Sequence, residues 1–258
     1  MEQSVLFDMT GKVALITGSS RGIGRAIAER MAEMGAKVVI SSRKADACAE
    51  VASMIVARGG EAIAHAASIS DKSALQSLVD RTLAEWGRID VLVSNAAVNP
   101  YYGPLLDIAD DAFDKIMASN VRSTIWLCKM VVPQMAERRD GSVIVVSSIA
   151  GLKGNTNLGA YGISKAADFQ LVRNLAVEYG PHNVRFNALA PAIIRTDFAR
   201  KLWEDPQIYA RAVSGYPLRR IGEPDEVAGA AVFLGSRAGA FITGQVITID
   251  GGVTIGGE

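Results

Sequence analysis

Residues 13–24 read VALITGSSRGIG, an apolar run that leads directly into a glycine-rich turn. A short continuous apolar run is typical of a strand buried on both faces of a parallel sheet. After the turn, apolar residues recur at the 3.6-residue spacing of a helix, which we expect to end at Gly35. The stretch therefore predicts a strand, a turn and a helix in direct succession.

The same alternation continues along the chain. Further strands are predicted at 37–41, 62–66, 91–94, 142–147, 184–189 and 245–249, and helices at 45–58, 72–86, 109–137 and 161–179. Strict alternation of strands and helices indicates a doubly wound parallel sheet. We therefore expect a single-domain α/β Rossmann fold over residues 1–258, with about seven strands and helices on both faces.

One segment, 192–217, does not fit this alternation. It is irregular in pattern but rich in large apolar residues, namely Ile193, Ile194, Phe198, Leu202, Trp203, Tyr209 and Tyr216. A long apolar insertion after a strand end is typical of a substrate-binding lid. A short packed helical hairpin is the alternative, and the two interpretations are compatible.

Composition narrows the function classes. The 258 residues are 49% hydrophobic, which is enough for one large core, and 27 basic residues balance 27 acidic ones. No net field attracts nucleic acid or an anionic membrane, so we expect a small-molecule substrate. Cys48 and Cys128 match no metal or redox spacing, and we expect reduced packing residues and no metal site. With no signal-peptide pattern and no membrane span, a cytoplasmic protein is expected.

The glycine turn predicts a phosphate site. Gly18, Gly22 and Gly24 let backbone approach a ligand closely, and the helix that follows presents free N–H groups. The spacing is G-x-x-x-G-x-G, which differs from the G-x-G-x-x-G of the standard dinucleotide fingerprint. A dinucleotide cofactor is the expected ligand.

The choice between NAD and NADP is predicted from the end of the second strand. An acidic residue there would hold the ribose 2'-hydroxyl, but residues 40–44 read ISSRK and contain no carboxylate. Arg43 can instead meet a 2'-phosphate, and Arg21 in the turn can close on it from the other side. These two arginines predict NADP(H).

Tyr161 and Lys165 form a candidate proton-transfer pair. Four residues apart on a helix, they lie one turn apart on the same face. A free tyrosine has a pKa near 10, about three units above neutral pH, and a neighbouring ammonium stabilises its phenolate. Ser148 follows the apolar run at 143–146 and supplies a further hydroxyl.

These motifs occur together and in order: Thr17-Gly18-x-x-x-Gly22-x-Gly24, Asn95-Ala96-Ala97, Asn120, Ser148 and Tyr161-x-x-x-Lys165. With them the chain resembles the classical short-chain dehydrogenase/reductase family from about residue 10 to its end. The resemblance implies that Tyr161 is the general acid or base and that Lys165 lowers its pKa while holding the nicotinamide ribose. It also implies that Ser148 binds the reacting oxygen and that Asn120 anchors a water in a proton relay.

The resemblance also implies which residues contact the ligands. Cofactor contacts are expected from Gly18, Ser20, Arg21, Gly22, Ile23, Gly24, Ser42, Arg43, Ser68, Ile69, Asn95, Ala96, Ala97, Tyr161, Lys165, Pro191, Ile194 and Thr196. Substrate contacts are expected from Ser148, Leu152, Asn157, Tyr161 and Trp203. The chain departs from the family at Ala97 and Ala192, where glycine is usual, and at Ser68-Ile69, where an aspartate often lies near the adenine.

Within the family, residues 39–44, 94–100 and 145–151 resemble the NADPH-dependent carbonyl and retinal reductase branch. This implies reduction of an aldehyde or ketone, and the family commonly forms homotetramers. The nearest alternative is a 3-oxoacyl carrier-protein reductase. A non-catalytic NADP(H) sensor would not need all four catalytic groups.

A serine hydrolase is the remaining alternative. Residues 18–22 match G-x-S-x-G, with Ser20 as the nucleophile. Such an enzyme needs an acid and then a histidine later in the chain, and only His65 and His182 exist. The hydrolase interpretation would leave Tyr161 and Lys165 unexplained.

Overall fold

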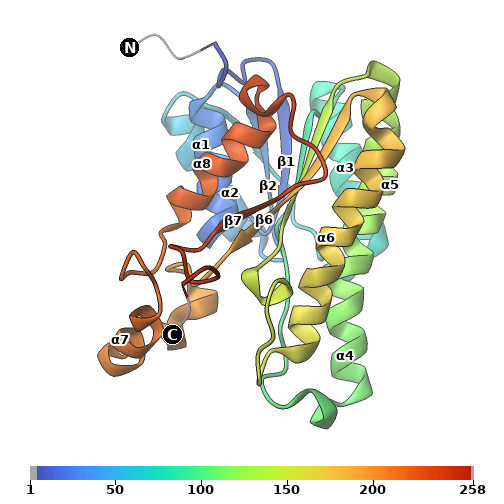
Figure 1. Cartoon of the computed structure of the whole chain (residues 1–258). Helices are drawn as coiled ribbons and strands as arrows, with labels where there is room; N and C mark the ends of the chain where they lie inside the picture. Colours follow the sequence, from blue (N-terminus) through green and yellow to red (C-terminus); the bar gives the residue numbers. More distant parts are fainter. Residues whose placement is uncertain (1–4, 257–258) are drawn as a thin grey trace.

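The computed structural model describes residues 5–256, which form a seven-stranded parallel sheet with helices on both faces (Figure 1). Residues 1–4 and 257–258 of the expected domain lie outside the described residues. The strand order is β3-β2-β1-β4-β5-β6-β7. Strands β2 and β3 are added on one side of β1, and β4 to β7 are added on its other side, so the order changes side between β1 and β4. The strands are β1 (Val13–Thr17), β2 (Lys37–Ser41), β3 (Glu61–Ala64), β4 (Val91–Ser94), β5 (Gly141–Val146), β6 (Val184–Pro191) and β7 (Val246–Ile249).

The helices divide between the two faces of this sheet. One core is formed with α1, α2 and α8, and the other with α3, α5 and α6. The α-helices are α1 (Gly22–Glu33), α2 (Ala45–Ala57), α3 (Lys72–Trp86), α4 (Asp110–Met117), α5 (Ser123–Arg138), α6 (Gly159–Tyr179), α7 (Pro206–Ser214) and α8 (Pro224–Gly235). Short helices are η1 (Leu105–Asp107), the π turn η2 (Ala118–Arg122), η3 (Ile149–Gly151), η4 (Gly180–His182), η5 (Asp197–Leu202) and η6 (Arg237–Gly239).

The position of β1 in the sheet explains why residues 13–16 are all apolar. Successive side chains of a strand point to opposite faces, so Ala14 and Ile16 enter the core of α1, α2 and α8, whereas Leu15 enters the core of α3, α5 and α6. All five residues of β1 are buried. The predicted doubly wound sheet is confirmed, and its switch point lies beside the glycine turn.

Several predicted elements have different bounds. The helix predicted at 109–137 is divided into α4 and α5 by the π turn η2, and the helix predicted from residue 161 begins two residues earlier. Strand β3 ends at Ala64, where the chain leaves the sheet, and β6 extends to Pro191. Cys48 and Cys128 are buried free thiols, as predicted, and burial raises the pKa of the Cys128 thiol to about 12.

Helix α8 was not predicted. It packs against α1 and the sheet, and its buried residues Val227, Ala228, Ala231, Val232, Leu234 and Gly235 leave it little polar face. A helix that is apolar on most sides shows no clear 3.6-residue alternation. Its start does carry a signal, because Pro224 follows Glu223, which forms a capping box with Glu226.

The segment 192–217 contains two short helices, η5 and α7 (Figure 1). Its far end is anchored by Tyr216, which is buried and whose hydroxyl accepts a hydrogen bond from the backbone N–H of Ile193 (3.2 Å). The segment is therefore partly helical, while Phe198, Leu202 and Ile208 in it are exposed. The packed hairpin and the role as a lid both stay predictions. Within residues 5–256 no helix is both long and apolar enough to cross a membrane.

Candidate active site

The predicted site residues gather at one edge of the sheet. The strands are all parallel, so their carboxyl ends share that edge. The glycine turn follows β1, Ser42 follows β2, Asn95 follows β4, Ser148 follows β5 and Pro191 ends β6. In open α/β sheets ligands bind in the crevice at this edge, near the switch point.

The backbone of the glycine turn suits an anion. Gly18 and Gly22 have φ values of +68° and +57°, which favour glycine. Helix α1 begins after Arg21 with no side-chain cap, so the N–H groups of its first turn are left for another acceptor. A cofactor pyrophosphate fits this helix start, where the N–H groups and the helix dipole both favour negative charge.

Asn95 holds the glycine turn in place. Its side-chain amide donates to the carbonyl oxygens of Thr17 (2.8 Å) and Gly18 (3.2 Å). The Thr17 hydroxyl accepts in return from the backbone N–H groups of Asn95 (3.1 Å) and Ala96 (3.2 Å). The sequence did not predict these hydrogen bonds between the end of β1 and the end of β4. The cofactor contacts expected of Asn95 and Ala96 stay predictions.

The two arginines assigned to the 2'-phosphate have different surroundings. Arg43 is exposed, and within the described residues it forms no ion pair. Arg21 Nη1 lies 3.6 Å from Asp197 Oδ2, at the start of η5. The positive charge of Arg21 is thus shared with the predicted lid.

The start of the segment 192–217, the predicted lid, lies over the glycine turn. A Cβ added to Gly22 would lie 3.2 Å from the methyl group of Thr196, which is tighter than most Cβ contacts, so Thr196 packs closely against the first turn of α1. Ile194, one of the expected nicotinamide contacts, is buried, and its bridge to Gly222 ties the lid back to the chain before α8. Thr196 and Ile194 are therefore fixed beside the predicted cofactor site.

The short helix η3, which follows Ser148, packs closely against the start of α6, the helix that carries Tyr161. A Cβ on Gly151 would lie 2.6 Å from the backbone nitrogen of Ala166, and one on Gly162 would lie 2.7 Å from the carbonyl oxygen of Ala150. With no side chain between them, η3 lies directly against the first turns of α6. The Ser148 hydroxyl accepts from Ala150 N–H (3.1 Å), which leaves its own proton free to donate.

Lys165 lies buried beneath the half-buried ring of Tyr161. Its ammonium is 5.7 Å from the centre of that ring and donates to the carbonyl oxygen of Val146 (3.0 Å) and to Asp168 Oδ2 (3.2 Å). Burial by itself lowers the pKa of Lys165. The charges of Asp168 and Tyr161, with the hydrogen bond to Asp168, together raise it by more than burial lowers it, so the pKa lies above its ordinary value. The lysine is therefore a cation in the site.

Asn120 lies in the π turn, a feature that often marks functional sites. Its Oδ1 accepts from Val98 N–H (2.9 Å), and its amide donates to Val98 O (3.0 Å) and to Ser164 Oγ (3.0 Å). Ser164 in turn donates to the carbonyl oxygen of Tyr161 (2.7 Å). Both amide N–H groups of Asn120 are thus used, one on the loop at Val98 and one on α6 at Ser164. The predicted role of Asn120 in anchoring a water would therefore need another of its polar groups.

The substrate residues predicted from the sequence are scattered. Leu152 is exposed beyond η3, and Asn157 joins the loop before α6 to Gly103 through its backbone carbonyl (3.0 Å). The Trp203 indole donates to the carbonyl of Thr196 (3.1 Å), within the lid itself. An aromatic residue that was not predicted as a substrate contact, Phe198, has its ring centre 6.4 Å from that of Tyr161, the predicted general acid.

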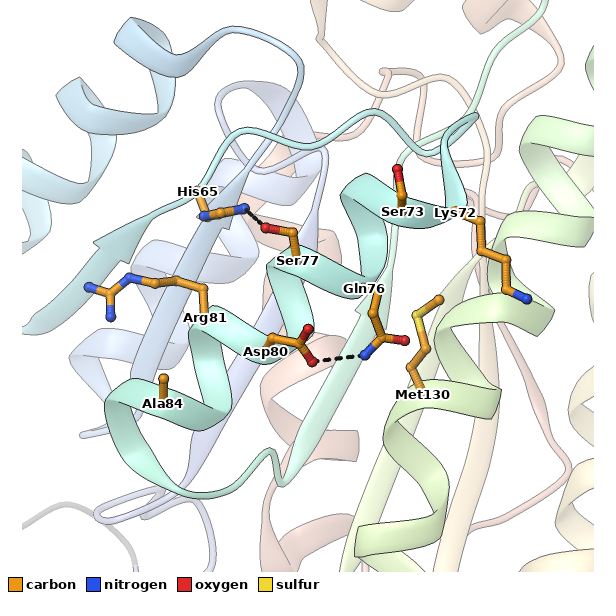
Figure 2. Close-up of a pocket in the computed structure, with 9 residues that line it drawn as sticks. All are labelled: His65, Lys72, Ser73, Gln76, Ser77, Asp80, Arg81, Ala84 and Met130. Atoms are coloured by element: carbon orange, nitrogen blue, oxygen red, sulfur yellow. Dashed lines mark hydrogen bonds between the residues drawn. The ribbon is translucent and has the colours of Figure 1, made fainter.

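A cavity of about 850 Å³ lies elsewhere, along α3 (Figure 2). None of the predicted site residues lines it, and four of its polar residues bond in pairs, His65 with Ser77 (3.2 Å) and Gln76 with Asp80 (2.8 Å). His182, in η4, precedes β6 and so lies at the opposite edge of the sheet from Ser20. The two histidines therefore do not complete a hydrolase triad with Ser20.

Comparison with known proteins gives the family. A family model described as enoyl-(acyl carrier protein) reductase matches residues 18–254. The chain is 41% identical over 244 residues to dehydrogenase/reductase SDR family member 4 of Bos taurus, covering 95% of this chain and 88% of the relative. The chain belongs to the short-chain dehydrogenase/reductase family.

Two solved structures are similar over nearly the whole chain. A 7α-hydroxysteroid dehydrogenase complexed with NADH and 7-oxo glycochenodeoxycholic acid has a TM-score of 0.93 and 36% identity, covering 98% of both chains. A 3-oxoacyl (acyl-carrier-protein) reductase from Agrobacterium tumefaciens C58 with NADP bound has a TM-score of 0.91 and 34% identity, covering 97% of both. This protein is accordingly an oxidoreductase that transfers a hydride between a nicotinamide cofactor and a carbonyl or alcohol substrate.

Proposed function

We propose that this protein is an NADP(H)-dependent reductase of aldehydes or ketones in which Tyr161 is the general acid. The supporting observation is that Lys165 Nζ lies 5.7 Å from the centre of the Tyr161 ring, and that η3, which follows Ser148, packs against the helix that carries both residues. The bound nicotinamide supplies the hydride. As negative charge builds on the substrate oxygen, the hydroxyls of Ser148 and Tyr161 donate to it, and Tyr161 transfers its proton.

Lys165 has the properties that this role requires. It is buried, charged and close to the Tyr161 ring, so its positive charge favours the phenolate that forms when the proton leaves. In the reverse direction the same phenolate accepts the proton of an alcohol. Tyr161 therefore serves as acid or base according to direction.

The preference for NADP(H) rests on Arg43 and Arg21. A hydrogen bond to a charged group contributes about 1.5 to 3 kcal/mol, so two contacts to a 2'-phosphate would give roughly 10- to 1000-fold preference over NAD(H) after desolvation losses. Arg43 is exposed and has no carboxylate partner among the described residues, which supports this assignment. The similar structures include one with NADH and one with NADP.

We expect an apolar substrate, because Phe198 from the lid faces Tyr161. A 3-oxoacyl carrier-protein reductase is the second candidate, supported by the similarity to the Agrobacterium enzyme. A cytoplasmic homotetramer is also proposed. Apolar side chains exposed on α6 at Val177 and before β7 at Phe241 support association of copies at those surfaces.

The test is turnover followed at the reduced-nicotinamide absorbance band. Wild type and Tyr161→Phe would be compared with NADPH or NADH and a panel of aldehydes, aryl ketones, diketones and 3-oxoacyl thioesters. Turnover that prefers NADPH and is lost in Tyr161→Phe supports the proposal, and the accepted substrates distinguish its two branches. Equal use of NADH and NADPH would contradict the role given to Arg21 and Arg43. Full activity of Tyr161→Phe would contradict the role of Tyr161 as the general acid.

A further inference from the structure

Asp168 is a charged residue in an apolar position. It is fully buried on the face of α6 that also buries Phe169, Val172 and Ala176. A carboxylate taken out of water at such a position is costly unless it is paired and hydrogen-bonded. The residue must therefore be matched by its surroundings or carry a role that offsets the cost.

The surroundings consist of one cation and few other polar groups. Asp168 Oδ2 accepts from Lys165 Nζ (3.2 Å), while Asp168 Oδ1 is buried without a hydrogen-bond partner. The two side chains are almost wholly enclosed, with Lys165 3% exposed and Asp168 0% exposed. An ion pair so shielded from solvent is screened little by salt.

The pairing leaves Lys165 one donor. An ammonium carries three N–H bonds, of which one goes to the Val146 carbonyl and one to Asp168. These two acceptors lie on different elements, β5 and α6, so they fix the position of Nζ below the ring of Tyr161. The remaining N–H is available to the tyrosine and to the cofactor.

We propose that Asp168 is a positioning residue that holds the Lys165 ammonium, in its charged form, one helical turn from Tyr161. This inference rests on the proposed roles of Tyr161 and Lys165 in proton transfer. Without the carboxylate, Lys165 is a cation buried in an apolar face, and burial favours its neutral form. A neutral lysine would not stabilise the tyrosine phenolate.

Few charges other than Asp168 act on this lysine. Within residues 5–256, only Asp168 and Tyr161 shift the pKa of Lys165 by their charges, and burial opposes them. Burial raises the pKa of Asp168 above its ordinary value, and Lys165 and the hydroxyl of Ser147, which follows β5, oppose this rise. Other elements packed against α6 also carry titratable groups, but none of these contributes to the shift of the Lys165 pKa. They are Asp110, Asp111, Asp114 and Lys115 in α4, Arg122 in η2, His182 in η4 and Arg185 in β6.

The first test is the pH profile of kcat/KM for carbonyl reduction in Asp168→Asn. Reduction requires a protonated tyrosine and a charged lysine. Removal of the Asp168 charge lowers the pKa of Lys165, so the lysine loses its proton at a lower pH, and we expect the high-pH limb to move to lower pH by about one unit or more. The exposed Glu178→Gln on the same helix is the matched control and should leave the limb in place.

A purely structural role has a different signature. If Asp168 only supported folding, kcat/KM would fall by the same factor at every pH and the limb would not move, which would overturn the proposal. Asp168→Leu removes the same charge without leaving a polar group to satisfy, and it replaces the asparagine variant if that protein does not fold. The same shift of the limb is expected in it.

A second measurement needs no turnover. In Asp168→Asn the folded-state pKa of Lys165 should fall below its unfolded value, so the variant gains stability as pH rises. The difference in Tm between wild type and Asp168→Asn should therefore be largest near pH 7 and narrow toward pH 10. A Tm difference that stays the same from pH 7 to pH 10 would overturn the pairing of Asp168 with Lys165. Full activity of Tyr161→Phe, measured separately, would overturn only the proposed function.

Discussion

The guanidinium of Arg21, in the glycine turn, faces the carboxylate of Asp197, the first residue of η5, at 3.6 Å. Asp197 is also held by Arg200 within the same helix. One carboxylate of the lid thus lies beside a cation expected to bind the 2'-phosphate. If Arg21 binds the 2'-phosphate as proposed, that phosphate and Asp197 would compete for its positive charge.

Asp197→Asn should strengthen NADPH binding. The substitution removes the competing charge from Arg21, and because the pair is exposed the gain should be no more than about five-fold at low salt. NADH binding should not change, since it lacks the 2'-phosphate. Fluorescence titration with both cofactors measures this, and Glu204→Gln in the same lid is the control. Equal gains for NADH and NADPH would show that Arg21 does not meet the 2'-phosphate.

Gly24→Ala should disrupt the glycine turn. The added Cβ would clash with the amide of Asn95 and lie 2.5 Å from the carbonyl oxygen of Gly18, and neither the backbone nor the bracing amide can move freely. Overpacking of this kind typically costs about 1–3 kcal/mol. We expect a lower Tm and weaker binding of both cofactors.

The control for this change is Gly229→Ala in α8. Nothing lies within 4 Å of a Cβ at that position, and alanine is the better helix former, so stability should be unchanged or slightly higher. Thermal unfolding and cofactor titration of the two variants separate local crowding from the general effect of replacing a glycine. Normal cofactor binding by Gly24→Ala would show that the turn tolerates the methyl group.

The sequence predicted the elements whose pattern is local. Strand β1 and the glycine turn could be located because a buried parallel strand is continuously apolar and the turn needs glycine at Gly18 and Gly22. The alternation that followed was sufficient for the doubly wound sheet. The positions of Tyr161 and Lys165 followed from helical spacing alone.

Features that depend on tertiary contacts could not be predicted in this way. No residue in the sequence marks the π turn around Asn120, whereas Pro133, a usual helix breaker, lies inside α5. The burial of Asp168 conflicts with its residue type, and only its pairing with Lys165 explains it. The contact of Phe198 with Tyr161 joins an irregular segment to a helix, for which no periodicity exists.

Glu226→Gln should weaken α8 in a pH-dependent manner. Arg220 and the N–H of Glu223 bond to this carboxylate and lower its pKa to about 2. A lowered folded-state pKa gives stability that is present above the ordinary value of 4.5 and is lost as pH falls toward 2. Because the side chain is 40% exposed, the loss at neutral pH should be at most about 1 kcal/mol.

Thermal unfolding at pH 7 and near pH 2.5 measures this contribution. The Tm difference between wild type and Glu226→Gln should be a few degrees at the higher pH and smaller at the lower one. Glu50→Gln, on the exposed face of α2, is the matched control and should show little difference at either pH. A difference for Glu226→Gln that is independent of pH would mean that its charge does not stabilise the start of α8.

Phe198→Ala should change substrate choice more than chemistry. The Phe198 ring is 65% exposed and lies 6.4 Å from that of Tyr161, so a substrate bound at Tyr161 would cover it. Loss of this apolar contact should raise KM for aryl ketones about ten-fold, with kcat nearly unchanged and small aldehydes little affected. Steady-state kinetics on the two substrate classes measure the split, with Ile208→Ala in α7 as a control that removes another exposed apolar side chain of the same segment. An equal fall in kcat for every substrate would instead mean that Phe198 acts by orienting Tyr161.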